Sequence, residues 1–170
     1  MKKKTAFCCI ALILLTACTG APPKPVVVDH PDIRAVVESF RTAIIQRDKP
    51  RFMSLFLADT PITWQAVMED GSLDRLRLTK PQAVKVRVKP DSTPQSFIDG
   101  IVHDDKLNEE VFENVRIDSD GDAAAVAFDY RYLYAGEETN HGREWWLLVR
   151  TDKGWKITSV VYSVTLPRRA

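Results

Sequence analysis

Hydrophobic residues after residue 30 first recur with the spacing of helices. The earliest helix is predicted to begin at Pro31, where Asp29 can cap it and the proline suits the first turn. A second, short helix is predicted to start near Pro50, and a third to run from Pro94 to His103. The buried face of the first helix is predicted to consist of Ile33, Val36, Val37, Phe40 and Ile44.

Further along the chain, apolar and polar residues alternate with the period of a strand. The turn signals Asp120-Gly121 and Lys153-Gly154 separate neighbouring runs, and a loop over residues 136–142 joins two others. Short connections of this kind imply antiparallel neighbours. The predicted strands cover residues 62–68, 110–118, 123–135, 143–151 and 155–165.

Residues 73–89 give a less regular pattern. Val84, Val86 and Val88 alternate there with basic residues, so we predict one or two strands with a basic outer face. Along the whole chain, helices come first and a long antiparallel sheet follows. This order predicts an α+β domain whose helices pack on one face of the sheet.

The N-terminal residues have the pattern of an export signal. Three lysines at positions 2–4 precede an uninterrupted apolar run over residues 6–15. A helix that crosses a membrane needs about 20 apolar residues, so this run is too short to be one. A charged start and a short apolar run followed by small residues are typical of a secretory signal.

The end of this signal, Leu15-Thr16-Ala17-Cys18, resembles the lipobox of bacterial lipoproteins. The resemblance implies that Cys18 is lipidated and that its acyl chains anchor the protein to a membrane of the cell envelope. Because Thr19 rather than Asp follows the cysteine, the outer membrane, facing the periplasm, is implied in a cell with two membranes. An ordinary cleavable signal with an accidental cysteine is the alternative.

The lipobox divides the chain into three parts. Residues 1–17 would be the signal, residues 18–29 a lipidated cysteine followed by a proline-rich tether, and residues 30–166 a single domain. The whole chain of 170 residues carries a net charge of +1, and loss of the signal leaves 21 basic against 23 acidic side chains, a charge of −2. Nucleic-acid binding needs a basic surplus, so we expect no nucleic-acid partner.

Several segments of the predicted domain resemble the NTF2-like superfamily, in its SnoaL-like or ketosteroid-isomerase-like branch. They are the paired N-terminal helices, the strand beginning Ile62-Thr63-Trp64, and residues 120–126, 145–149 and 154–160. The resemblance implies a cone, in which a strongly bent antiparallel sheet wraps around the helices and leaves a pocket between them. Some members are enzymes and others only bind ligands or partners, so the fold alone does not choose a function.

Aromatic residues on the predicted strand over 123–135 would line such a pocket. Phe128, Tyr130 and Tyr132 share one face of this strand, and Trp64 and Phe97 are the other pocket candidates. Aromatic rings supply an apolar wall and tyrosine hydroxyls supply hydrogen bonds, so we expect a small apolar ligand. Ordinary core packing is the alternative for each of these side chains.

Trp145 and Trp146 are neighbours in a predicted strand, so their side chains face opposite sides of the sheet. One is expected in the core or pocket and the other on the outer face. An exposed tryptophan there would suit an interface, so we expect a homodimer formed through the sheet face. Cover by a helix or loop is the alternative.

Candidate catalytic residues are few. Asp129 is the only carboxylate inside its predicted strand, and it becomes the candidate base if the faces of that strand are reversed. The sequence His103-Asp104-Asp105 suggests a proton relay or part of a metal site, although a solvated helix end is the simpler interpretation. Asp118, Asp120 and Asp122 have the spacing of the first half of a calcium loop. Its sixth position is Ala123 rather than glycine and its twelfth is Asp129 rather than glutamate, which favours a charged hairpin. We expect no metal and no cofactor.

Three functions remain open at this point. The first is a membrane-tethered, non-catalytic module that binds a small apolar ligand in its cone or a partner protein on its sheet. The second is a pocket enzyme of the isomerase, dehydratase or hydrolase type. The third is an assembly component of an envelope machine such as a secretion system.

Overall fold

The computed structural model describes residues 30–87 and 89–168, and in this part of the chain short helices precede a run of long strands. The helices are α1 (Pro31–Gln46), α2 (Lys49–Ser54), α3 (Asp70–Arg77) and α4 (Pro94–His103). The strands are β1 (Thr63–Met68), β2 (Asn108–Ser119), β3 (Ala123–Tyr134), β4 (Glu137–Thr151) and β5 (Gly154–Val164).

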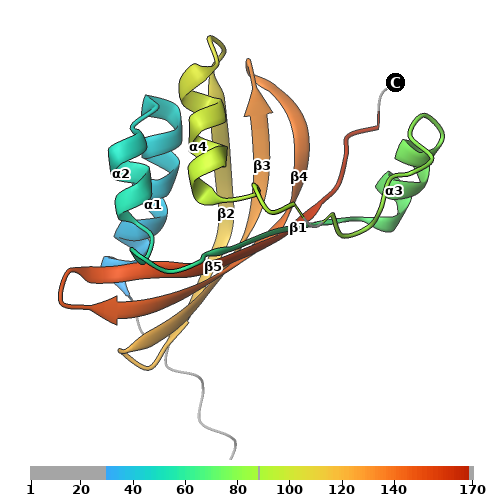
Figure 1. Cartoon of the computed structure of the whole chain (residues 1–170). Coiled ribbons are helices and arrows are strands. Elements are labelled where there is room, and N and C mark those ends of the chain that lie inside the picture. Colours follow the sequence, from blue (N-terminus) through green and yellow to red (C-terminus); the bar gives the residue numbers. More distant parts are fainter. Residues whose placement is uncertain (1–29, 88, 169–170) are drawn as a thin grey trace, which may run out of the picture.

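The five strands form one sheet in the order β1-β5-β4-β3-β2. Helices α1, α2 and α4 lie on its concave side, whereas α3 stands apart beyond β1 (Figure 1). The predicted α+β class, with helices on one face of a bent sheet, is therefore confirmed. The sheet is mixed rather than wholly antiparallel, because β1 pairs in parallel with β5 while the other neighbours are antiparallel. A strand far ahead of its partner in sequence can join in parallel because the intervening chain supplies the crossover.

An aromatic cluster fills the space between the helices and the sheet. Phe40 of α1 lies at its centre, with its ring centroid 4.7 Å from those of both Phe52 on α2 and Trp146 on β4. Phe40, Phe52 and Trp146 are almost fully buried. Large aromatic side chains bury much apolar surface, so this cluster holds the helices against the concave face.

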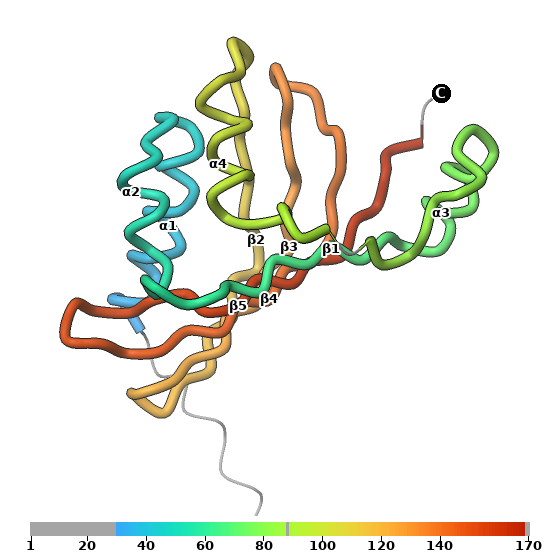
Figure 2. The backbone as a smooth tube through the Cα atoms, in the orientation of Figure 1, coloured from blue at the N-terminus to red at the C-terminus, as the bar shows by residue number. Residues whose placement is uncertain are grey.

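The long strands change direction along their length (Figure 2), and their pairing is irregular at several places. The β2–β3 register shifts between Glu113 and Arg116, where Asn114 takes a positive φ of 54°. Further shifts occur between β3 and β4 and between β4 and β5. An extra residue in one strand of a pair bends that strand, which produces the cone.

The β3–β4 connection is shorter than predicted. Instead of a loop over residues 136–142, only Ala135 and Gly136 join the two strands, and both have positive φ values, 52° and 82°. Two residues of this kind form the tight hairpin turn that matches the twist of a sheet. As a result, β4 starts at Glu137, and residues assigned to a loop lie in the sheet.

The prediction of strands over residues 73–89 is wrong. Residues 70–77 form α3, because the Glu69 side chain accepts hydrogen bonds of 2.7 Å from the backbone N–H groups of both Gly71 and Ser72. This is a helix N-cap, which outweighs the weak alternation of the leucines. Val84 and Val86 are exposed, and Val86 makes only an isolated bridge to Val67.

The predicted helix over 94–103 is confirmed, as is the first helix from Pro31. His30, rather than Asp29, precedes that first helix as its N-cap, and its side chain makes no capping hydrogen bond. Asp29, the export signal, Cys18 and the tether lie outside the described residues, so their roles stay predictions. Within residues 30–87 and 89–168, no helix is long and apolar enough to span a membrane.

We predict that Gly142→Ala destabilises the protein by about 1–3 kcal/mol, because over-packing of a tight contact costs this much. A Cβ atom at Gly142 would lie 2.0 Å from the backbone oxygen of Ser163 on β5. Urea denaturation of the purified protein measures the change. Gly100→Ala on α4 is the control, since nothing lies within 4 Å of its added Cβ and alanine favours a helix. Equal stability of the two variants would contradict the prediction.

Candidate ligand site

A cavity of about 140 Å³ opens on the concave face of the sheet, between β1, α4 and the four long strands. Aromatic rings and a few polar groups share its lining, as in ordinary small-molecule sites. Its lining residues are Trp64, Phe97, Glu110, Tyr130, Tyr132, Asn140, Glu144 and Tyr162.

Two glutamates enter the cavity because they occupy inward positions of their strands. Glu110 shares its face of β2 with Phe112, and Glu144 shares its face of β4 with Trp146. Across the sheet, Glu110 pairs with Tyr132 and Glu144 pairs with Tyr162. The alternation of each strand therefore places a carboxylate where an apolar side chain is usual.

Both carboxyl groups are buried, with Glu110 6% and Glu144 3% exposed. Loss of water raises the pKa of Glu110 well above its ordinary value, and the charge of Glu144 raises it further. Burial also raises the pKa of Glu144, to about 7, although a hydrogen bond from the Trp146 indole partly offsets this effect. Near neutral pH the pair therefore retains a proton that an exposed glutamate would have lost.

The two glutamates are not equally provided with partners. Glu144 Oε1 accepts the hydrogen bond from Trp146 Nε1. Glu110 Oε2 is buried and has no hydrogen-bond partner in the structure. A buried acceptor without a donor costs about 1–3 kcal/mol, so its presence needs an explanation.

Tyrosine hydroxyls surround the pair, and those of Tyr130 and Tyr132 donate to other groups. Tyr130 donates a 2.8 Å hydrogen bond to the backbone oxygen of Ser163, and Tyr132 donates one of 2.6 Å to Asn108 Oδ1. Burial is the main cause that raises the pKa of Tyr130 and Tyr132, and it raises that of Tyr162 to about 12. The tyrosines are therefore neutral donors throughout the physiological range.

Four of the five residues expected to line a pocket lie around this cavity: Trp64, Phe97, Tyr130 and Tyr132. Phe128 does not. Its ring packs in the aromatic cluster, 4.3 Å from Phe112 and 4.9 Å from Trp146 between centroids. The tyrosine-rich face of β3 points toward the helices at these positions.

Asp129 lies on the opposite face of β3, away from the cavity. It is half-buried and accepts a 2.8 Å hydrogen bond from the Asn114 side chain. Asp129 would be a candidate base only if the faces of its strand were reversed. They are not reversed, because Tyr130 and not Asp129 occupies the inward position.

The two adjacent tryptophans separate as predicted. Trp146 is buried in the core, which removes it as an interface candidate, whereas Trp145 is 45% exposed on the outer face beside the exposed Leu147. The guanidinium of Arg143 lies 5.5 Å from the centre of the Trp145 ring. Trp145 and Leu147 thus form an exposed apolar patch on the outer face, and a homodimer through this face stays a prediction.

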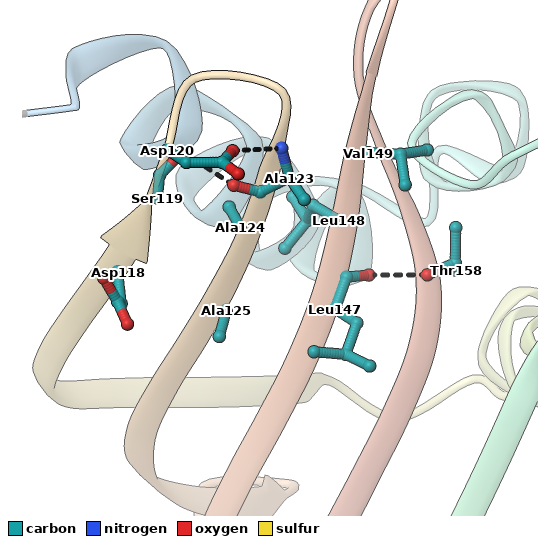
Figure 3. A pocket seen from close by; sticks show the side chains of 10 residues that line it. All are labelled: Asp118, Ser119, Asp120, Ala123, Ala124, Ala125, Leu147, Leu148, Val149 and Thr158. Atoms are coloured by element: carbon teal, nitrogen blue, oxygen red, sulfur yellow. Dashed lines mark hydrogen bonds between the residues drawn. The ribbon is translucent and has the colours of Figure 1, made fainter.

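The other acidic and histidine clusters have local roles. His103 Nδ1 lies 2.7 Å from the backbone oxygen of Asp99, and Asp104 accepts from the backbone N–H of Lys106. Figure 3 shows the hollow beside the β2–β3 hairpin, where the Asp120 carboxylate accepts a hydrogen bond from the backbone N–H of Ala123. Asp120 also accepts from the backbone N–H of Asp122, and the hollow has a volume of about 440 Å³. In residues 30–87 and 89–168, no three His, Cys, Asp or Glu side chains gather as metal ligands would.

The sequence interpretation missed Glu110 and Glu144. The alternation of the strands could have indicated that both point inward, because each lies two residues before a buried or half-buried aromatic residue on the same face. Glu144 follows from placing Trp146 inward. Glu110 is at the start of its predicted strand, where a charged residue is usually taken as solvated.

Solved structures share this architecture. A proposed dehydratase of the NTF2-like family from Streptomyces avermitilis aligns with a TM-score of 0.57 and 18% identity, over 81% of this chain and 96% of that one. The fold is NTF2-like. An NTF2-like superfamily protein from Salmonella enterica aligns with a TM-score of 0.55 and 16% identity, over 82% and 92% of the two chains.

A third structure, a proposed scytalone dehydratase from Novosphingobium aromaticivorans, aligns with a TM-score of 0.56 and 14% identity, over 82% of this chain and 89% of that one. No protein-family model and no curated protein sequence matches the chain. At these identities the likeness establishes the NTF2-like fold, and the function has to be argued from the cavity itself.

We predict that the free energy of unfolding falls as pH rises from about 4.5 through 7. The ordinary glutamate pKa is 4.5, and that of folded Glu144 is about 7, so the folded protein holds a proton that the unfolded chain has released. Glu110, whose pKa is also raised, adds to the fall. Urea denaturation at pH 5 and pH 8 should differ by more than about 1 kcal/mol.

The Glu144→Gln variant tests the source of this pH dependence. Glutamine keeps an oxygen for the Trp146 indole but cannot ionise, so the difference between pH 5 and pH 8 should shrink. Glu113→Gln, an exposed position on β2, is the control and should leave the difference unchanged. A wild-type stability that rises between pH 5 and pH 8 would contradict the assignment.

Proposed function

We propose that this protein is a binding module of the cell envelope, tethered by a lipid on Cys18, and that it holds a small molecule in the cavity of its NTF2-like cone. The ligand would place an apolar part against the aromatic rings and a polar part against Glu110 and Glu144. A wholly apolar ligand fits less well, because it would leave the buried Glu110 Oε2 atom without a donor.

The observation that carries this proposal is the unpartnered, buried Glu110 Oε2 atom beside the aromatic lining. Two carboxyl groups buried together lower stability, and a fold keeps such a cost where it serves a site. A ligand that donates a hydrogen bond to Glu110 would recover part of the lost free energy. The cavity is thus better suited to hold a molecule than to complete the core.

The tether is proposed from the sequence alone. Leu15-Thr16-Ala17-Cys18 has the order of residues that a lipobox requires, and prolines follow it at positions 22, 23 and 25. A proline-rich segment is stiff, so it would hold the domain away from the bilayer. The outer membrane, with the domain in the periplasm, is the proposed location in a cell with two membranes.

We predict that Cys18→Ala abolishes incorporation of labelled palmitate and releases the protein from the membrane fraction. The thiol is the only atom at this position able to take the lipid. Cys9→Ala, inside the apolar run of the signal, is the matched control and should be labelled as well as the natural chain. Palmitate labelling of Cys18→Ala, or none of the natural protein, would refute lipidation at Cys18.

We predict that native mass spectrometry of the processed protein, purified from cells in detergent, shows an added mass of a small molecule. A Glu110→Gln, Glu144→Gln double variant should lose this mass, whereas Glu113→Gln should keep it. The same spectrum gives the oligomeric state and tests the homodimer expected through Trp145. An empty natural protein, with no small molecule released on denaturation, would contradict the binding function.

An acid–base enzyme is the second candidate, favoured by one observation. The pKa of Glu144 is about 7, so this group could donate or accept a proton near neutral pH, as buried catalytic carboxyls do. Conversion of the co-purified molecule on incubation with the natural protein, and its persistence with Glu144→Gln, would favour the enzyme. Release of an unchanged molecule would favour the binding module.

A further inference from the structure

The ionisable groups that can carry charge in the cavity are acidic and not basic. Two of its eight lining side chains are carboxylic acids, and none of the eight is lysine, arginine or histidine. The three tyrosines stay neutral because burial raises the pKa of each. A ligand with a carboxylate or phosphate would therefore meet repulsion without a compensating cation.

The hydrogen-bonding capacity of the cavity is one-sided as well. Glu110 is only 6% exposed, and its Oε2 atom has no hydrogen-bond donor. Tyr130 and Tyr132 cannot supply one while they donate to Ser163 and Asn108. No described group donates to Glu110 Oε2, so a ligand that carries an N–H group would supply the missing donor.

Aromatic rings form a connected wall around these acceptors. The Trp64 ring centroid lies 5.1 Å from that of Phe97 and 6.3 Å from that of Tyr162. Tyr132 lies 6.3 Å from Phe97, edge to face. The faces of aromatic rings carry partial negative charge and attract organic cations.

We propose that the cavity binds the head of a protonated primary or secondary amine, with its N–H groups donated to Glu110 and Glu144 and its carbon atoms against Trp64 and Phe97. This inference rests on the proposed binding function and names the chemical class of its ligand. A cavity of about 150 Å³ holds benzene, so one of 140 Å³ admits an amine of about five or six heavy atoms, or the end of a longer one.

Binding of such a cation requires a proton to leave. An alkylammonium keeps its charge up to a pH of about 10.4, as lysine does, so the proton displaced is the one that the glutamate pair retains. The titratable groups that face the pair are Tyr130 and Tyr132 from β3 and Tyr162 from β5, whereas α4 and β1 contribute only Phe97 and Trp64. Affinity should therefore rise with pH between 5 and 8 through the pair alone.

The test compares three probes of one shape: n-butylamine, 1-butanol and butyrate. Isothermal titration calorimetry of the purified protein at pH 8 should show n-butylamine binding at least about tenfold more tightly than 1-butanol, with butyrate weakest. Its affinity should fall at least about tenfold from pH 8 to pH 5, since one displaced proton changes affinity up to tenfold per pH unit. Indole NMR signals of Trp64 report whether each probe enters the cavity.

Variants connect the preference to the pair. The Glu110→Gln, Glu144→Gln double variant should lose both the preference for the amine and its pH dependence, while its unfolding curve shows that it folds. Glu113→Gln should bind as the natural protein does. If the alcohol binds at Trp64 as tightly as the amine, or butyrate binds most tightly, the amine inference is wrong and the binding function stands. If no probe perturbs Trp64 and the protein from cells is also empty, the binding function itself fails.

Discussion

A hydrogen bond from the indole of Trp146 to the carboxyl group of Glu144 links the aromatic core of this molecule to its cavity. On one side of it lies the aromatic cluster that fixes α1 and α2 to the sheet, and on the other lies the polar cavity. The indole packs against Phe40 and Phe128, so its N–H has a fixed direction. The packed indole therefore helps to fix the position of the Glu144 carboxyl group.

The same arrangement explains why the cavity is costly and still stable. Buried carboxyl groups lose hydration, and two of them close together repel one another when ionised. The fold accommodates them by retaining protons, by the Trp146 bond, and by a wall of rings that supplies much buried apolar surface. A protein that needed only a filled cone would gain stability from leucine or methionine at these two positions.

The sequence allowed the prediction of most elements, and the errors have definite physical causes. Helices α1 and α4 and the four long strands follow from apolar spacing and turn signals. Helix α3 was missed because its N-cap, Glu69, is a residue type that also occurs in turns. The parallel pairing of β1 with β5 depends on contacts far apart in sequence, which local periodicity does not contain.

The lining of the cavity could be predicted only in part. The rings of Trp64, Phe97, Tyr130 and Tyr132 follow from hydrophobic phase, because aromatic residues on an inward face are expected there. To predict that Glu110 and Glu144 point inward, the same alternation has to be followed even where it places a charged residue inside. For Glu110 the prediction also requires the correct start of β2, which is the least certain feature of any strand read from sequence.

The irregular pairing at Asn114 has a consequence for how this cone can vary. The residues of β2 on either side of the bulge keep their partners on β3, so the extra residue adds curvature without turning any side chain over. Removing it would flatten the sheet while Glu110 and Phe112 stayed inward. Different residues therefore determine the width of the cone and the chemistry of its interior. Evolution or design can change the width while the interior chemistry stays the same.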